Sequence, residues 1–300
     1  MIYRSLGTTG LSVSVIGLGC GHLGTQGRRT RRGEIVSLLH QALDRGLTFF
    51  DTADIYMGGE SERLLGEVLS PHRARVLIAT KVGYRPALPA WLVKYARPLR
   101  WWAVRRGGMA GGVAANAGRL VRRPDFSAGY LRRAVEASLS RLRTDRIDLL
   151  QLHSPSEAVL AGGEALATLE RLKQEGKVRF YGLAFATCSD AQAALSADGP
   201  ISTIQMPISL GDSAAAADVL AWAGRRGIGV IANQPLRKGA LLRDGITAEQ
   251  ALGFVTSLPG VATVLVGTTR RSHLEQNVAA VVAGPSSVAT SSAMRAESPR

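Results

Sequence analysis

Cysteine is scarce in this sequence, which has two, Cys20 and Cys188, among 300 residues. Their separation matches no metal-site spacing, and two cysteines cannot build a disulfide-rich domain. Apolar runs of about 18 residues are absent, so no membrane span is expected. The first residues also lack the basic segment followed by an apolar one that marks a signal peptide. We therefore expect a cytoplasmic protein with no bound metal.

Acidic residues and lysines are also few. The chain has 37 Lys and Arg against 23 Asp and Glu, which gives a formal net charge of +14, and five of the 37 are lysines. Residues 84–124 contain nine basic residues and no acidic one, so they hold most of that charge. No nucleic-acid-binding motif accompanies them, so a nucleic acid is not an expected partner.

Short apolar runs rich in β-branched residues alternate with longer amphipathic stretches. Eight runs are predicted strands: 13–18, 47–51, 76–80, 147–152, 178–183, 202–206, 228–232 and 262–266. Eight stretches are predicted helices: 33–46, 61–70, 127–142, 163–176, 188–197, 213–227, 247–258 and 272–283. Apolar strands joined by helical crossovers indicate a parallel sheet, and eight such units predict an α/β fold of the (β/α)8 TIM barrel type. An open doubly wound sheet is the alternative, but no G-x-G-x-x-G motif lies in the first strand–helix turn.

Cap residues mark some boundaries of the predicted helices. Ser61 and Ser127 are expected to cap the starts of two helices, because their hydroxyl groups can accept from free backbone N–H groups. Gly176 and Gly227 are expected to end two others, because glycine tolerates the left-handed conformation that follows a helix.

A long insert, residues 82–124, interrupts the third strand–helix unit. Loops of this length in a compact domain usually form lids or binding elements. The insert mixes tryptophan with arginine, and two interpretations stay open. It is either a solvated lid whose aromatic residues pack on the barrel mouth, or an amphipathic surface helix that touches an anionic surface. The polar residues 284–300 predict a disordered tail, which leaves one expected domain, residues 1–283.

Titratable side chains stand at the ends of three consecutive predicted strands. Asp51 ends the second strand, and Tyr56 follows five residues later. Lys81 comes directly after the third strand and His153 directly after the fourth. In a (β/α)8 barrel the C-terminal ends of the strands carry the active site, so these four side chains are expected to lie together. Asp54 is interpreted as a local turn or capping residue.

The chemistry of this group is that of a proton donor. Tyrosine is a poor acid at neutral pH because its ordinary pKa is about 10. The ammonium of Lys81 would favour the phenolate of Tyr56 and so ease proton release. Asp51 would hold that ammonium by an ion pair, and His153 would orient a substrate carbonyl by hydrogen bonding. The group would protonate an oxyanion as a hydride arrives at carbon.

The segments that carry these residues resemble the aldo-keto reductase family. They are FFDTADIYMGGESERLLG, ATKVG and LLQLHSP, with YRSLGTTGLSVS before them and VGTTRRSHLEQNVAA after them. The resemblance covers nearly the whole chain. It implies a TIM barrel with an N-terminal β-hairpin and NADPH bound extended across the mouth. It also implies Tyr56 as the general acid and Lys81 as the residue that tunes it. Asp51 would be the partner of the lysine, and His153 would orient the substrate.

The nicotinamide end of the implied cofactor site departs from the family pattern. Ala184 and Phe185 replace the Ser-Asn pair that holds the nicotinamide carboxamide, and neither side chain can make that hydrogen bond. Gln205 matches the family's glutamine and is expected to hold the carboxamide. Asn233 stands where an aromatic residue often stacks on the ring, and Phe185 is considered as a substitute covering face.

The adenosine end of the cofactor is expected on the segment GTTRRSHLEQN. Arg270 and Arg271 are expected to bind the 2′-phosphate, because guanidinium matches phosphate geometry, and this favours NADPH over NADH. With Gln205 and Asn233, the expected cofactor-binding residues are Gly19, Cys20, Asp51, Leu236, Lys238, Gly267, Thr268, Thr269, Arg270, Arg271, His273, Gln276 and Asn277.

The predicted function is NADPH-dependent reduction of a small-molecule aldehyde or ketone, with Tyr56 as proton donor. One alternative is a redox-neutral lyase, dehydratase or isomerase on the same scaffold, with Tyr56 or His153 as acid or base. A non-catalytic cofactor-binding or regulatory protein is the other alternative. The complete set of four titratable residues argues against it, since such a protein has no need of them.

Overall fold

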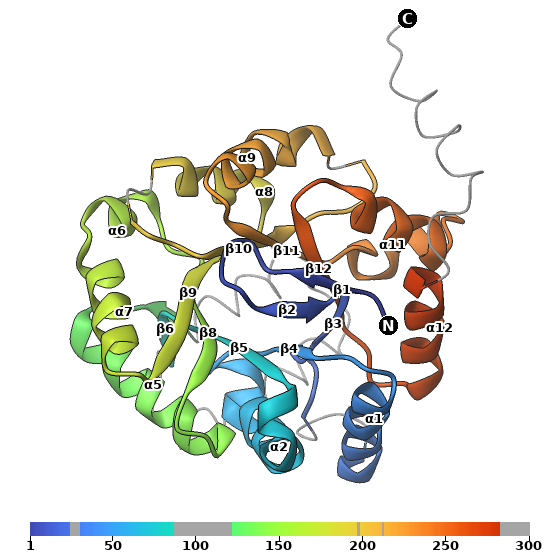
Figure 1. Ribbon diagram of the computed structural model, residues 1–300, viewed down its shortest axis with the longest axis horizontal. Coiled ribbons are helices and arrows are strands. Elements are labelled where there is room, and N and C mark those ends of the chain that lie inside the picture. The colour runs from blue at the N-terminus through green and yellow to red at the C-terminus, as the bar shows by residue number, and fades with distance from the viewer. Residues whose placement is uncertain (25–30, 87–121, 197–198, 212, 283–300) are drawn as a thin grey trace, which may run out of the picture.

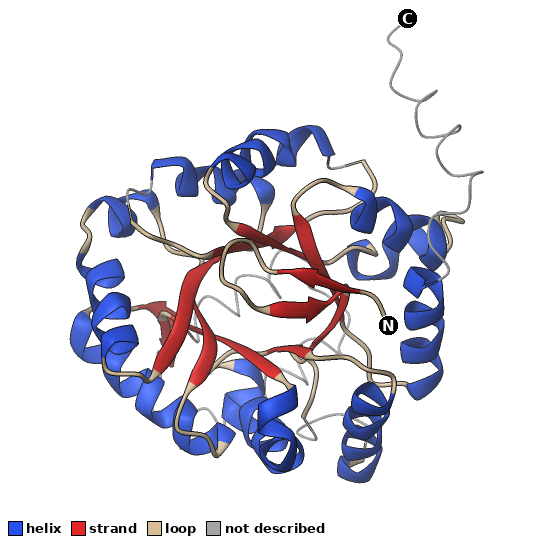
Figure 2. Cartoon of the chain, viewed as in Figure 1, coloured by secondary structure: helices blue, strands red, loops and turns tan. Residues whose placement is uncertain are grey.

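Eight parallel strands close into a barrel that a ring of helices surrounds (Figures 1 and 2). The structure is a computed structural model that describes residues 1–24, 31–86, 122–196, 199–211 and 213–282. The barrel strands are β3 (Ile16–Gly19), β4 (Phe49–Asp51), β5 (Leu77–Val82), β8 (Ile147–His153), β9 (Val178–Ala184), β10 (Thr203–Pro207), β11 (Gly229–Asn233) and β12 (Val261–Val266). They follow one another around the barrel in chain order, and β12 pairs with β3 to close it. The predicted (β/α)8 TIM barrel is confirmed.

The long helices follow the strands as the apolar periodicity predicts. They are α1 (Arg32–Asp44), α2 (Glu60–Leu69), α5 (Ala128–Leu142), α7 (Glu164–Gln174), α9 (Ser213–Arg225), α11 (Ala248–Ser257) and α12 (Arg271–Val282). The helix expected at 188–197 is shorter, with α8 (Cys188–Ala191) continuing as the 3₁₀ turn η3 (Gln192–Ser196). Further short elements are η1 (Tyr56–Gly59), η2 (Ser70–Arg75), α6 (Glu157–Ala161), η4 (Arg237–Gly239) and α10 (Ala240–Arg243). No helix in the described ranges has the length and apolar character needed to cross a membrane.

The predicted first strand, 13–18, is in fact two strands. β2 (Ser12–Ser14) pairs antiparallel with β1 (Tyr3–Ser5), whereas β3 joins the barrel. Val15 separates them, because its N–H donates to Ile2 and its carbonyl accepts from Val264, a barrel residue. A single short, mostly apolar run therefore serves two sheets.

The β1–β2 hairpin closes one end of the barrel and lies across the middle of the ring of strands in Figure 1. Its side chains Leu6, Leu11 and Val13 pack with Phe49 and other residues of the barrel interior. At the hairpin turn, Gly7 has a φ of 57°, and an added Cβ would lie 2.4 Å from a backbone atom of β11. A side chain would be excluded there by both conformation and contact. The opposite end of the barrel, at the C-terminal ends of the strands, is therefore the one open to a substrate.

Two glycines end helices as expected, whereas Ser61 does not cap one. Gly176 and Gly227 follow α7 and α9 with φ values of 75° and 65°. α2 begins one residue before Ser61, after Gly59, and the Ser61 hydroxyl is buried and donates to the carbonyl oxygen of Cys20 at 2.9 Å. Ser127 does precede α5, but its hydroxyl donates to Asp125 and caps no N–H group.

Only the two ends of the predicted insert 82–124 lie within the described residues. β6 (Tyr84–Pro86), which follows β5, pairs antiparallel with β7 (Arg122–Pro124), which precedes α5. Residues 87–121, on which the lid and anionic-surface interpretations rest, lie outside the described residues, as does the predicted tail 284–300. β5 also extends to Val82, so the insert begins beyond the residue expected.

Candidate active site

Lys81 forms a buried ion pair with Asp51 inside the barrel. Its Nζ donates to Asp51 Oδ1 at 2.5 Å and to the carbonyl oxygen of Thr52 at 2.9 Å. The register between β4 and β5 pairs Asp51 with Ala79. Because side chains two residues apart on a strand share a face, Lys81 lies one step above Ala79 and reaches back to the end of β4. The expectation that Lys81 follows the strand is wrong, since it lies within β5.

Both charges of this pair are almost completely removed from water, with exposed fractions of 2% for Lys81 and 4% for Asp51. A buried charge without a partner costs several kcal/mol, so each group depends on the other. Burial alone would lower the pKa of Lys81. The carboxylate of Asp51 and the neighbouring Tyr56 raise that pKa above its ordinary value. Lys81 is therefore a fixed positive charge at neutral pH.

Tyr56 is the first residue of η1, the turn that follows β4. Its N–H donates to the carbonyl oxygen of Ala53 at 3.0 Å. The N–H of Asp54 donates to the carbonyl oxygen of Lys81 at 3.1 Å, which joins this turn to β5. The centroid of the Tyr56 ring lies 5.3 Å from Lys81 Nζ. A phenolate formed at Tyr56 would face a buried ammonium, and opposite charge at this range favours the ionised form.

His153 is the last residue of β8. Like Lys81, it was expected directly after its strand and instead lies within it. Its ring meets the ring of Tyr56 edge-on, with centroids 6.1 Å apart and planes at 89°. It meets Tyr84 of β6 in the same manner at 5.3 Å. The structure thus gathers the four predicted residues from three consecutive barrel strands and from η1, the turn after β4. Tyr84 is a neighbour that sequence reasoning missed, and an aromatic residue three positions after Lys81 was the available signal.

Asp54 makes more than the local turn contact expected of it. Its Oδ2 lies within hydrogen-bond distance, 3.3 Å, of the hydroxyl of Tyr130 on α5. Burial, together with the negative charge of Glu62, raises the pKa of Asp54 to about 7. A carboxyl beside the four residues therefore changes charge near neutral pH.

Two side-chain amides present carbonyl oxygens at this end of the barrel. Gln205 of β10 donates from Nε2 to Asp51 Oδ2 at 3.5 Å. Its Oε1 is buried, as is Oδ1 of Asn233 at the end of β11, and neither oxygen has a hydrogen-bond partner among the described residues. A buried carbonyl oxygen without a donor costs about 1–3 kcal/mol. The N–H groups of a nicotinamide carboxamide are donors of the kind these oxygens need, so the residues present fit that group.

The residues that replace the family's Ser-Asn pair contribute no hydrogen bond from their side chains. Ala184 ends β9 and is buried. The Phe185 ring is 3% exposed and packs in the large hydrophobic core. Its backbone N–H donates to the carbonyl oxygen of Gln205 at 2.8 Å, which fixes β9 against β10. The suggestion that Phe185 covers a nicotinamide ring is therefore wrong.

Two predicted cofactor residues leave bare backbone on the barrel rim. Gly19 ends β3, and Gly267 directly follows β12. The two glycines are neighbours, because a Cβ added at Gly267 would lie 3.6 Å from the carbonyl oxygen of Gly19. Backbone without side chains lets a ligand approach closely. Cys20 is different, because it is fully buried and its Sγ donates to the carbonyl oxygen of Leu18 at 3.3 Å. Burial raises the pKa of this thiol, and its side chain has no surface to offer a ligand.

The start of α12 has the features of an anion site. Thr268 Oγ1 accepts from the N–H of Arg270 at 3.0 Å in a turn that precedes the helix. Arg271, the first helical residue, donates from Nε to Gln41 at 3.2 Å, and the Arg270 side chain is exposed. The first-turn N–H groups of a 12-residue helix, together with two guanidinium groups, favour phosphate binding.

The remaining predicted cofactor residues fall into two groups. One group is Thr269, His273, Gln276 and Asn277, on or just before α12, and Asn277 is buried while His273 and Gln276 are exposed. The other is Leu236 and Lys238, on the segment that follows Asn233, where Lys238 is exposed.

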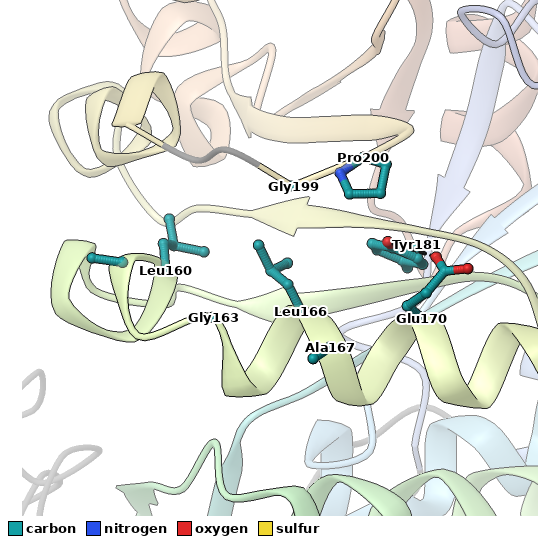
Figure 3. A pocket seen from close by; sticks show the side chains of 9 residues that line it. Leu160, Gly163, Leu166, Ala167, Glu170, Tyr181, Gly199 and Pro200 are labelled. Carbon is teal, nitrogen blue, oxygen red and sulfur yellow. Dashed lines mark hydrogen bonds between the residues drawn. The ribbon is translucent and has the colours of Figure 1, made fainter.

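A pocket of about 400 Å³ lies away from this site, against the outer side of β9 (Figure 3). Leu160, Leu166 and Pro200 line it, and its polar contact is the hydroxyl of Tyr181 donating to Glu170 Oε2 at 2.9 Å. None of the four gathered residues reaches it.

Known proteins similar to this chain include enzymes of one family. The sequence pattern of the Aldo/keto reductase family matches residues 15–249. An L-galactose dehydrogenase of Arabidopsis thaliana is 28% identical over 93% of this chain and 87% of its own length. An aldo-keto reductase of Bacillus halodurans, solved in its holo form, is 26% identical, with a TM-score of 0.77 over 99% of this chain and 96% of its own. An aldo/keto reductase of Klebsiella pneumoniae, solved with NADP and acetate, is 27% identical, with a TM-score of 0.71 over 96% and 93%.

Proposed function

Because this chain belongs to the aldo/keto reductase family, we propose that it reduces an aldehyde or ketone with NADPH and that Tyr56 donates the proton. The observation that carries the proposal is the buried ammonium of Lys81, held 2.5 Å from Asp51 and 5.3 Å from the Tyr56 ring. A fixed positive charge beside a phenol lowers the free energy of the phenolate that remains after proton transfer.

The side chains divide the work around a substrate carbonyl. The Tyr56 and His153 rings meet edge-on with centroids 6.1 Å apart, so a substrate carbonyl oxygen beside both would accept hydrogen bonds from both. Those bonds strengthen as negative charge develops on the oxygen, which lowers the barrier more than they stabilise the bound substrate. Tyr56 then gives its proton to that oxygen, and Lys81 compensates the charge left on the phenol.

NADPH, when bound, supplies the hydride. Gln205 and Asn233 would accept from its carboxamide, and the bare rim at Gly19 and Gly267 would face it. The support for a cofactor with a 2′-phosphate is the arginine pair at the start of α12, together with the solved Klebsiella relative that contains NADP.

The test of this proposal is Tyr56→Phe, which removes the transferable proton and keeps the ring. We expect kcat to fall by about 10²–10⁴-fold while the Kd for NADPH changes by less than about twofold. Tyr3→Phe is the matched control, because its hydroxyl is exposed on β1 and bonds to Gly46. Full activity in the Tyr56 variant would refute the proton-donor role. Conversion of substrate without consumption of NADPH would point to the redox-neutral alternative.

A further inference from the structure

One hydroxyl beside the active site lies between two acceptors. The Tyr130 hydroxyl is 2.5 Å from the carbonyl oxygen of Tyr84 and 3.3 Å from Asp54 Oδ2. A hydroxyl has one proton and donates it to one acceptor at a time. The shorter contact places that proton on the bond to Tyr84. An ionised Asp54 would then face the lone pairs of the hydroxyl oxygen, whereas a protonated Asp54 would donate to them.

The surroundings of Asp54 make both charge states accessible near neutral pH. Burial raises the pKa of Asp54 to about 7, with a further contribution from the charge of Glu62. Among the described residues, the charged or titratable groups that face it are Glu62 on α2 with Tyr130 and Arg141 on α5. Glu62 is itself fully buried, and its carboxylate accepts from Arg141 at 2.6 Å and from Thr80 at 2.7 Å.

The Tyr84 carbonyl matters because the Tyr84 ring packs on His153 at 5.3 Å. Tyr84 begins β6, a strand of three residues, so few ladder hydrogen bonds hold it. The residue before it, Gly83, has a φ of 129°, and an added Cβ would lie 2.3 Å from the Phe126 ring. The bond from Tyr130 therefore anchors the start of the β6–β7 ribbon to α5.

We propose that Asp54 and Tyr130 are positioning residues that act on His153 through Tyr84. While Asp54 is protonated, it donates to Tyr130, and Tyr130 donates to Tyr84 and holds its ring against His153. When Asp54 ionises, the Tyr130 proton turns to the carboxylate and the Tyr84 anchor is lost. The link to activity rests on the proposed function, in which His153 orients the substrate carbonyl. The anchor itself exists without substrate or cofactor.

The direct test is hydrogen exchange of the β6 and β7 amides in the cofactor-free protein. Wild type and Asp54→Asn are compared at the same pH, so that intrinsic exchange rates cancel. The asparagine amide donates to Tyr130 at every pH and imitates protonated Asp54. At about pH 6 the two proteins should exchange alike. At about pH 8 wild type should exchange about fivefold faster, the effect of losing one hydrogen bond of about 1 kcal/mol.

Two further variants distinguish this Asp54–Tyr130–Tyr84 relay from a general structural effect of the substitution. Tyr130→Phe lacks the donor, so its ribbon should exchange fast at both pH values. Glu170→Gln alters the tyrosine–carboxylate pair at Tyr181, on the outer side of β9, and should behave as wild type (Figure 3). Equal exchange of wild type and Asp54→Asn at the higher pH would overturn the proposal.

The activity readout follows from the same relay. In wild type, kcat/KM for carbonyl reduction should fall about fivefold as pH rises through the Asp54 pKa of about 7, and this step should be missing in Asp54→Asn. A step that persists in the variant would overturn the proposal. If the chain reduces no carbonyl compound, the proposed function fails, but the exchange experiment still decides whether the relay exists.

Discussion

Removing one partner of the Asp51–Lys81 pair should destabilise the protein strongly. Lys81→Met keeps most of the buried volume, but among the described side chains it leaves the Asp51 carboxylate only the weak contact with the Gln205 amide at 3.5 Å. Uncompensated buried charges of this kind cost about 3–5 kcal/mol. We therefore expect the free energy of unfolding to fall by that amount. Urea unfolding followed by tryptophan fluorescence, to which the buried Trp222 contributes, measures it.

The double variant distinguishes a lost charge pair from a packing defect. Asp51→Asn combined with Lys81→Met removes both charges, so it should recover more than half of the stability lost in the single variant. The exposed pair between Arg45 and Glu275 is the matched control, with side chains 52% and 47% exposed, and Arg45→Met should cost less than about 1 kcal/mol. A single variant within about 1 kcal/mol of wild type, or a double variant no more stable than the single, would refute the reasoning.

The same pair predicts the direction of the stability change at high pH. The pKa of Lys81 is raised in the folded protein, so its contribution is complete below the ordinary lysine pKa of 10.5. The contribution is lost as pH rises through the higher folded value. Urea midpoints should therefore fall more steeply above about pH 10.5 in wild type than in Lys81→Met, and parallel profiles would contradict this assignment.

Three other predictions concern the cofactor and the hairpin. Arg271→Ala should raise the Kd for NADPH about tenfold and leave the Kd for NADH unchanged in nicotinamide fluorescence titrations. Equal losses of affinity for the two cofactors would contradict a 2′-phosphate contact. Asn233→Ala should weaken both cofactors alike, by about five- to tenfold in the same titration, because both carry the carboxamide; unchanged Kd values would exclude this contact. Leu11→Ala should lower the free energy of unfolding by about 2–5 kcal/mol and leave kcat unchanged, and a fall in kcat would show that the hairpin reaches the active end.

The fold was accessible from sequence because each barrel strand is a short apolar run and each crossover a periodic helix. The predictions that were wrong concern the ends of strands and helices, where hydrogen bonds to distant parts of the chain decide the boundary. The run 13–18 reads as one strand, but Val15 bonds to Ile2, just before the hairpin, and to Val264 of the barrel. Ser61 has the chemistry of a helix cap, yet its hydroxyl is drawn into the contact with Cys20. Local patterns cannot show which of two competing hydrogen bonds the folded chain makes.

The main residues of the candidate site could also be predicted from the sequence. Asp51, Lys81 and His153 fall at consecutive strand ends, and barrel geometry alone predicts that such positions converge. The relay from Asp54 was not accessible, because Tyr130 comes 76 residues later on α5 and nothing in its own neighbourhood suggests a partner. The burial of Phe185 was also missed, because an aromatic residue at a strand end fits the core as well as it fits a ligand.

The central claim is hydride transfer to a carbonyl carbon, and isotope tracing tests it most directly. The wild-type protein would be incubated with a panel of aldehydes and ketones and with NADPH that carries deuterium at the transferable position. Hydride transfer should place one deuterium on the former carbonyl carbon of the alcohol, with NADPH consumed in equal amount. A product that carries no deuterium, formed without loss of NADPH, would contradict it.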